Sequence, residues 1–248
     1  DIDKFKDPEG LTWTKQFSIY DEADAQSLVK EIVTQELQLD PKRFEPKKVR
    51  WAISNAKNQG WSPDDLEANA EGQRGKLSAD VYRRYRKALA ANNALDFDDL
   101  LLLPVQLLQQ NEQVRGYWYR RFRHVLVDEY QDTNRTQYEL IKLLVTDGKE
   151  PQQVDDWSGR SVFVVGDADQ SIYSFRAADF TILMGFQDDF GDKAPDDVTR
   201  TMVKLEENYR STATILEAAN ALISNNSERI DKVLRPTRGE GELISLTR

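Results

Sequence analysis

Polar side chains follow two short apolar runs, at positions suited to binding a nucleotide. Asp128 and Glu129 come directly after Val125–Val127, and Asp167 follows Val162–Val165. Short runs rich in β-branched residues are typical of buried parallel strands, whose carboxyl ends form the ligand-binding edge of open α/β sheets. An Asp-Glu pair at that edge suits a magnesium-nucleotide, because one carboxylate can hold the ion while its neighbour orients or deprotonates an attacking water.

Solvated acids without a chemical role are the alternative explanation of such a pair. For Asp128 and Glu129 alone, that alternative would be the better one. A second strand end in the same chain, followed by Gln170 and by the aromatic and basic residues of 171–176, favours the nucleotide interpretation.

Strands and helices alternate in the region that carries these residues. Apolar runs predict strands at 125–127, 162–165 and 202–205, and helical spacing predicts helices at 133–145 and 180–190. This alternation is typical of βαβ units with a parallel sheet, so we expect an α/β fold.

The region before the sheet has a different character. Residues 11–91 show helical spacing almost throughout, with a short extended segment at 17–20 as the exception. Asp21 precedes an acidic first turn, and Ser62 is a cap followed by Pro63 at the first helical position. An all-helical unit is therefore expected ahead of the α/β region.

Composition excludes several classes of protein. Of the 248 residues, 39% are hydrophobic and 31% charged, as in a soluble globular chain. The absence of cysteine excludes disulfides and thiolate metal sites, and the single histidine, His124, excludes His-based zinc sites and Ser-His catalysis. No apolar run is long enough to cross a bilayer, and the start shows no signal-peptide pattern. We expect a cytoplasmic protein without a membrane partner.

The net charge of −9 does not decide whether the partner is a nucleic acid, since binding depends on a local basic path. Two short basic clusters, 83–87 and 120–123, are as compatible with a solvated helix face as with phosphate contacts.

Longer blocks of sequence resemble motifs of superfamily 1 DNA helicases of the UvrD/PcrA/Rep group. In the family's order they are DEYQDTN at Asp128–Asn134, GDADQSIYSFR at Gly166–Arg176 and LEENYRS at Leu205–Ser211, with a weaker DFDDL block at Asp96–Leu100. The resemblance implies an α/β fold with a partial P-loop (RecA-like) parallel sheet and flanking helices, plus an all-helical accessory subdomain. It also implies a domain division: an accessory subdomain at 1–91, the later half of the first motor domain at 92–211, and the start of the second at 212–248.

The resemblance also implies roles around ATP and Mg²⁺. Asp128 would hold the magnesium ion, and Glu129 would activate water for attack on the γ-phosphate. Gln170 would sense the γ-phosphate through its amide, which both donates and accepts hydrogen bonds. Tyr209 would stack on the adenine, and Arg210 would approach the γ-phosphate as an arginine finger.

DNA contacts are implied for a further three residues. Tyr173 and Phe175 would stack on bases of single-stranded DNA, with Arg176 nearby, and base stacking contributes roughly 1–3 kcal/mol per base. Ordinary packing of the two rings is the alternative. Phe175 stands where the family frequently has Trp, and Ala177 where it usually has Gly. For the DFDDL block, a helix N-terminus rich in acids is as good an explanation as contact with DNA.

A phosphate-cradling loop, G-x-x-x-x-G-K-[ST], is absent from the sequence. Gly72–Leu77 comes closest, but Ala70 and Leu77 depart from the pattern and no apolar strand precedes it. The family carries this loop near its N-terminus and further motifs late in its second motor domain. We therefore expect an internal fragment, inactive as an isolated ATPase or helicase, whose unpaired sheet edges favour self-association.

The sequence thus predicts part of an ATP-dependent 3′-to-5′ helicase that binds single-stranded DNA and single-strand/duplex junctions. A helicase-derived module that binds nucleic acid or protein without hydrolysing ATP is one alternative. The helicase part of a helicase-nuclease is another. A magnesium-dependent nuclease built on Asp128, Glu129 and Asp132 is a more distant one.

Overall fold

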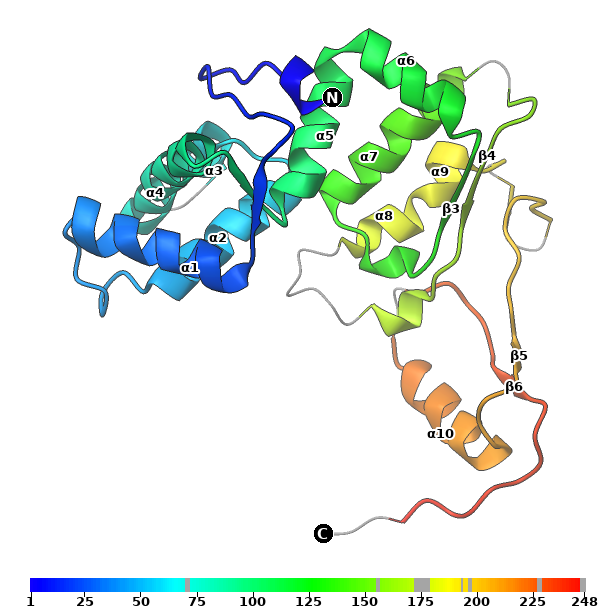
Figure 1. Ribbon diagram of the computed structural model, residues 1–248. Helices are drawn as coiled ribbons and strands as arrows, with labels where there is room; N and C mark the ends of the chain where they lie inside the picture. Colours follow the sequence, from blue (N-terminus) through cyan, green and yellow to red (C-terminus); the bar gives the residue numbers. More distant parts are fainter. Residues whose placement is uncertain are drawn as a thin grey trace.

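The computed structural model combines helices with short parallel strand pairs (Figure 1). It describes residues 1–69, 72–154, 157–171, 179–192, 194–195, 198–226 and 229–245. Within these ranges, no helix is both long enough and apolar enough to cross a membrane. A mixed fold of helices and small parallel sheets confirms the expected α/β class.

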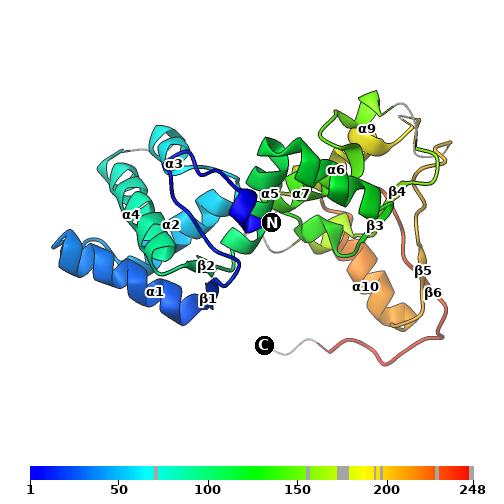
Figure 2. The ribbon, with the colours of Figure 1, turned by 45° about the horizontal axis from the view of Figure 1, so that its top comes forward.

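A group of helices forms one end of the molecule and packs around its own apolar core (Figures 1 and 2). It consists of α1 (Glu22–Glu31), α2 (Pro46–Asn58), α3 (Pro63–Asn69) and α4 (Gly72–Ala91). Two predicted helix starts are confirmed. Asp21 accepts a hydrogen bond from the Asp24 backbone (2.9 Å), and the Ser62 hydroxyl accepts one from the Asp65 backbone (3.1 Å) just before α3. These caps are local, which is why the sequence reveals them.

In sequence, the helical group is flanked by two strands, β1 (Ser18–Tyr20) and β2 (Ala94–Asp96). They pair in parallel, with Ser18 opposite Ala94. Residues ahead of β1 pack elsewhere. Phe5 and Trp13 are buried with Leu95 in a second core cluster, and the Trp13 indole donates to the Ala94 carbonyl (3.0 Å). The helical unit therefore begins after β1, whereas the chain before β1 covers the second cluster.

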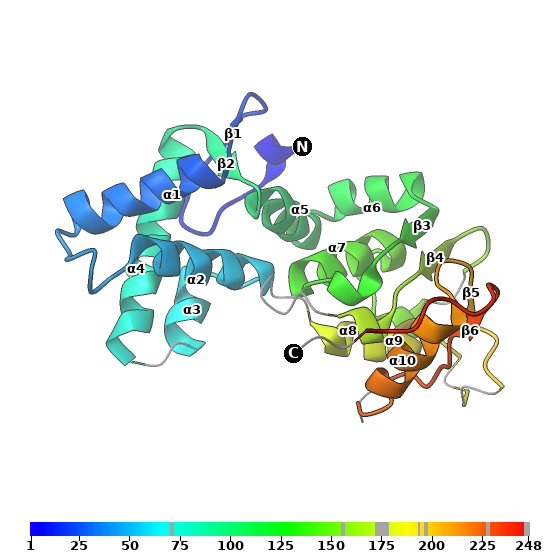
Figure 3. The same cartoon turned by 90° about the horizontal axis from the view of Figure 1, so that it is seen from below.

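The second group of elements contains the strand pair β3–β4 (Figure 3). It contains α5 (Asp99–Gln110), α6 (Glu112–Arg121), β3 (His124–Val127), α7 (Arg135–Thr146), β4 (Ser161–Val164), α8 (Phe180–Met184) and α9 (Phe186–Phe190). The strands predicted at 125–127 and 162–165 and the helix predicted at 133–145 are confirmed within a residue or two at each end. The helix predicted at 180–190 is divided at Gly185, a poor helix former.

The strand predicted at 202–205 is wrong. In that segment Val203 and Leu205 are 79% and 75% exposed, and the strand lies further on, at β5 (Glu207–Asn208), paired with β6 (Arg235–Pro236). A strand needs a partner for its backbone groups, and no described segment pairs with residues 202–205. The helix between β5 and β6 is α10 (Ala213–Ile223).

Two buried tyrosines behind the β3–β4 pair differ in how their hydroxyls are satisfied. The Tyr138 hydroxyl donates to the Asp189 carboxylate (2.6 Å), whereas the buried Tyr130 hydroxyl, its ring against Phe186, has no hydrogen-bond partner among the described residues. Burial raises the pKa of both phenols, with Asp189 adding to the effect.

We expect Tyr130→Phe to leave the free energy of unfolding unchanged or to raise it by up to about 1 kcal/mol, because it removes an unsatisfied buried group. Tyr138→Phe should lower it by about 1–2 kcal/mol, because a hydrogen bond to a carboxylate is lost. Urea denaturation of both variants measures the difference. A Tyr130→Phe protein less stable than Tyr138→Phe would contradict the conclusion that only the Tyr138 hydroxyl contributes a hydrogen bond to stability.

Candidate functional site

The two polar strand ends meet at one edge of the β3–β4 pair, as the sequence predicts. The strands are parallel, with Val127 opposite Val164. Beyond them, the Val165 backbone donates to the Val127 carbonyl (2.8 Å), and the Tyr130 backbone donates to the Val165 carbonyl (2.9 Å). The chain after β3 is therefore interlocked with the chain after β4.

Gly166 allows this close approach. A Cβ at this position would lie 2.7 Å from the Gln131 Oε1 atom and 3.1 Å from its backbone nitrogen. The 2.7 Å separation is shorter than real Cβ contacts, so a larger residue here would displace the Gln131 side chain, and glycine leaves room for it.

Asp128 and Glu129 are exposed at this edge. Glu129 has a left-handed backbone (φ 51°, ψ 42°), a conformation that costs a non-glycine residue roughly 1–2 kcal/mol. The Asp128 Oδ1 atom accepts a hydrogen bond from the Glu129 backbone (2.9 Å), which holds the turn. Backbone strain of this kind is concentrated at functional sites.

Gln131 connects the two strand ends, and sequence reasoning did not single it out. Its side-chain Nε2 donates to the Glu129 Oε2 atom (2.7 Å), and its Oε1 accepts from the Asp167 backbone (3.0 Å). The residue is only 2% exposed. The one signal in the sequence is its place inside the DEYQD block.

Gln170 lies on the second strand end, in a 3₁₀ turn at Ala168–Gln170. It is exposed, and its Nε2 donates to the Asp167 Oδ2 atom (2.8 Å). Asp128, Glu129 and Gln170, all predicted site residues, are thus brought to the same edge of the sheet through Gln131 and Asp167.

Basic residues from the C-terminal segment hold the same turn, which sequence reasoning also missed. Lys232 forms ion pairs with Asp167 and, at 3.5 Å, with Asp169, and Arg229 pairs with Asp169 at 3.3 Å. Burial alone would raise the pKa of Asp167, but the Lys232 ammonium and the Gln170 amide outweigh it and lower that pKa. The carboxylates of this turn are therefore structural partners of the C-terminal segment.

The acids at this edge fit a magnesium ion that arrives with a phosphate ligand. Among the described residues there is no group of three or more His, Cys, Asp or Glu side chains that could hold a metal alone. Nucleotide-borne Mg²⁺ needs only one or two carboxylates. Asp128 is exposed, and its Oδ2 atom has no hydrogen-bond partner within the described ranges, while Asp132 has a buried Oδ1 without one.

Tyr209 and Arg210 come from another part of the chain, the turn between β5 and α10. The Asn208 side chain accepts from the Arg210 and Ser211 backbones (3.0 and 2.9 Å), and the Tyr209 hydroxyl donates to Glu207. Tyr209 is 66% exposed. The structure records no contact of either predicted residue with Asp128, Glu129 or Gln170 in the part of the chain that it describes.

The predicted DNA-contacting residues Tyr173, Phe175 and Arg176 lie outside the described residues. The basic cluster at 83–87 forms ion pairs within the chain. Its arginines pair with carboxylates of the chain itself: Arg83 with Asp64 and Glu67, Arg84 with Asp80 and Glu36, and Arg86 with Asp7 and Glu9. The Gly72–Leu77 stretch is the start of α4, not a loop after a strand.

The DFDDL block forms a buried ionic cluster where the helical group meets α5. The fully buried Lys57 ammonium lies 2.9 Å from Asp96 Oδ2 and 2.7 Å from Asp99 Oδ1. The Tyr85 hydroxyl also donates to Asp96 (2.8 Å), and Arg50 approaches Asp98 (3.2 Å). Asp96 and Asp99 also accept each other's backbone N–H at the start of α5, which supports the helix-start explanation, but both acids pair with Lys57 as well.

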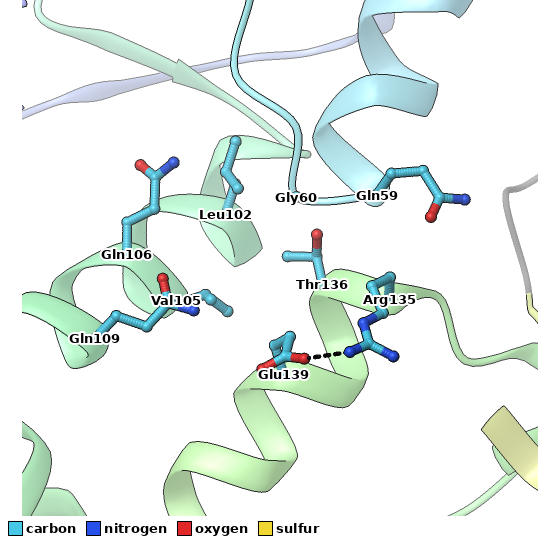
Figure 4. Close-up of a pocket in the computed structure, with 9 residues that line it drawn as sticks. All are labelled: Gln59, Gly60, Leu102, Val105, Gln106, Gln109, Arg135, Thr136 and Glu139. Atoms are coloured by element: carbon cyan, nitrogen blue, oxygen red, sulfur yellow. Dashed lines mark ion pairs between the residues drawn. The ribbon is translucent and has the colours of Figure 1, made fainter. Parts of the chain in front are cut away.

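A cavity of about 230 Å³ lies at the same junction, between the end of α2, α5 and α7 (Figure 4). The Arg135–Glu139 ion pair (2.9 Å) lies on its α7 side. The amides of Gln59 and Gln106 point in different directions and do not converge on a common point. No residue of the strand-end segments lines it, so it is separate from the candidate site.

Known protein families match most of the chain. A model of the UvrD/REP helicase N-terminal domain matches residues 3–191, and one of the UvrD-like helicase C-terminal domain matches residues 203–248. The ATP-dependent DNA helicase UvrD1 of Mycobacterium leprae is 44% identical over 231 residues, which cover 92% of this chain and 28% of the relative.

Other relatives give the same picture. The ATP-dependent DNA helicase PcrA of Bacillus subtilis is 39% identical over 243 residues, 98% of this chain and 30% of its own length. PcrA of Staphylococcus aureus is 39% identical over 239 residues, 96% and 30% of the two lengths. The chain spans less than a third of the length of these relatives.

Proposed function

Because this chain belongs to the UvrD/REP helicase family, we propose that it carries half of the ATP-hydrolysing site of a 3′-to-5′ DNA helicase. The observation that supports this most directly is the meeting of Asp128, Glu129 and the Gly166–Gln170 segment at one edge of the β3–β4 pair. Catalytic groups of open α/β sheets gather at such an edge.

In the proposed reaction, water attacks the γ-phosphorus of ATP and the bond to the bridging oxygen of ADP breaks. Glu129 accepts the proton of the attacking water, and Gln170 contacts the γ-phosphate. Asp128 would hold the Mg²⁺ that neutralises charge on the phosphates. The exposure of all three side chains at one sheet edge supports this division of roles.

Tyr209 and Arg210 are proposed to contact the adenine and the γ-phosphate. Their support is chemical: an exposed aromatic ring, and an exposed guanidinium without an ion pair among the described residues. The Lys232 and Arg229 ion pairs to the Asp167–Gln170 turn support an approach of the C-terminal segment to the site. Single-stranded DNA and its duplex junctions are the proposed substrates, with Tyr173, Phe175 and Arg176 as contacts.

We also propose that the elements correspond to parts of the family's two motor domains. The α1–α4 group would be the accessory subdomain, the region around β3–β4 a partial RecA-like sheet, and the segment from residue 212 the start of the second motor domain. Separate apolar clusters support the first division. Because Phe5 and Trp13 belong to the second cluster, the accessory subdomain is proposed to begin after β1 rather than at residue 1.

The test is a chimera in which this chain replaces its matching segment of Bacillus subtilis PcrA, termed the PcrA chimera below. We expect the PcrA chimera to hydrolyse ATP when single-stranded DNA is added, and to unwind duplexes from a 3′ tail. The isolated chain should hydrolyse none, because its 248 residues contain no phosphate-cradling loop.

Other outcomes would favour the alternatives. A folded PcrA chimera that binds DNA but hydrolyses no ATP would favour a binding module. Divalent-dependent DNA cleavage without ATP, by the isolated chain, would favour a nuclease. Circular dichroism of the PcrA chimera, compared with that of PcrA itself, separates loss of function from failure to fold.

A further inference from the structure

The Gln131 side chain is the only described side chain that hydrogen-bonds to both strand-end segments of the candidate site. One end of its amide donates to the Glu129 carboxylate (2.7 Å), and the other accepts from the Asp167 backbone (3.0 Å). At 2% exposure, the residue is shielded from competing water. Both of these hydrogen bonds are therefore made within the protein rather than shared with solvent.

The turn after β4 is built around this amide. The absent Cβ of Gly166 leaves the space that Gln131 Oε1 fills, since an added Cβ would lie 2.7 Å from it. Asp167 then accepts from the Gln170 amide at 2.8 Å. The result is a continuous series of hydrogen bonds from Glu129 through Gln131 and Asp167 to Gln170.

Only an amide satisfies both of these contacts. Glutamine carries a donor and an acceptor at the end of one side chain, whereas a glutamate accepts at both oxygens and a lysine only donates. Glutamate at position 131 would keep the acceptor for the Asp167 N–H but would set a second carboxylate against Glu129. The chemistry of the contact therefore requires this residue type, beyond a requirement for packing.

We propose that Gln131 is a positioning residue that couples movement of the Gly166–Gln170 turn to the orientation of the Glu129 carboxylate. This inference rests on the proposed function, in which Glu129 activates water. Glu129 is exposed and has a strained backbone, so the hydrogen bond from Gln131 restrains its carboxylate. A shift of the turn moves the Asp167 N–H, with it the Gln131 amide, and through that amide the base.

The C-terminal segment acts on the same turn. Lys232 pairs with Asp167 and Asp169, and Arg229 pairs with Asp169. Movement of that segment is thereby transmitted to the turn, and through Gln131 to Glu129.

Amide hydrogen exchange of the 248-residue chain tests the contact itself. We expect Gln131→Met to speed exchange of the Asp167 N–H by about tenfold or more, because the N–H loses its acceptor. Gln131→Glu, which keeps that acceptor, should leave the rate nearly unchanged. Gln137→Met is the matched control, since the Gln137 amide accepts from the Asn134 backbone (3.0 Å) and touches neither strand end. Protection of the Leu143 and Val145 amides reports that each variant is folded.

Unchanged Asp167 exchange in a folded Gln131→Met protein would overturn the proposal.

Kinetics of the PcrA chimera test the role. Both Gln131 variants should lower kcat about 10- to 100-fold, with the KM for ATP within about twofold, because misplacing the base affects the chemical step more than binding. Gln137→Met should leave both constants unchanged. A purely structural role would instead lower kcat in proportion to the folded fraction, and Gln131→Glu would then be as active as the control.

The two levels of hypothesis fail in different ways. A folded PcrA chimera without ATPase activity refutes the proposed function. An active chimera whose kcat survives both Gln131 substitutions overturns the positioning role alone.

Discussion

Lys57→Met is expected to lower the free energy of unfolding by about 3–5 kcal/mol, the usual cost of removing one partner from a buried ion pair. Lys57 is fully buried and lies within 3 Å of both Asp96 and Asp99. Methionine fills a similar volume but leaves two carboxylates close together with less positive charge nearby. Urea denaturation at neutral pH measures the loss.

Lys47→Met is the control for this substitution. Lys47 lies on the same helix, α2, but is exposed, so its replacement should change stability by less than about 0.5 kcal/mol. A loss in Lys57→Met no larger than in Lys47→Met would mean that the ionic cluster contributes nothing to stability.

Lowering the pH should reduce the difference in free energy of unfolding between Lys57→Met and the wild type. Although burial alone would raise the pKa of Asp96, Lys57 and Arg50 hold it at about 2, below the ordinary 3.8. The stability contributed by Asp96 is therefore present above pH 3.8 and is lost as the pH falls through about 2. Lys57→Met lacks most of this contribution, so the free energies of unfolding of the two proteins should become similar in that pH range.

The pKa of Asp99 is shifted in the opposite direction to that of Asp96. Burial, with the neighbouring Asp96 charge, raises the pKa of Asp99 to about 6 despite the Lys57 ammonium. The folded protein therefore holds a proton on Asp99 that the unfolded chain releases between pH 3.8 and 6, and this contribution to stability declines as the pH rises through that window. Asp99→Asn should remove that decline, which denaturation at a series of pH values measures.

Glu129→Gln is expected to lower kcat for ATP hydrolysis by the PcrA chimera about 10²- to 10⁴-fold, the range associated with loss of a general base. The amide keeps the size of the side chain but cannot take the proton of the attacking water. Because Asp128, the proposed magnesium ligand, is unchanged, binding of a fluorescent ATP analogue should be retained. The measurements are steady-state hydrolysis and an equilibrium titration of the same preparation.

Glu139→Gln is the matched control for this loss. Glu139 lies on α7 in a partly buried ion pair with Arg135, and it lines the cavity rather than the strand-end site. The PcrA chimera with Glu139→Gln should hydrolyse ATP at the rate of the unsubstituted chimera. Hydrolysis by Glu129→Gln at that same rate would show that the base is another residue.

Much of this protein is determined by local sequence. The caps at Asp21 and Ser62, the helix at 135–146 and the strands before Asp128 and Asp167 depend on residues within a turn or two of each other, so a pattern along the chain reveals them. The family follows from motif blocks that are contiguous in sequence, and the two polar strand ends follow from the parallel sheet.

Tertiary structure decided the contacts that join distant residues. Gln131 meets Asp167, Lys57 meets Asp96, and Arg83 meets Asp64, in each case through pairing that no local pattern encodes. From the sequence alone, the basic cluster at 83–87 is therefore equally suited to binding phosphate. The structure shows that its arginines pair with carboxylates of the chain instead. The strand expected at 202–205 failed for the same reason: an apolar run favours an extended chain, but a strand forms only where a second backbone satisfies its hydrogen bonds.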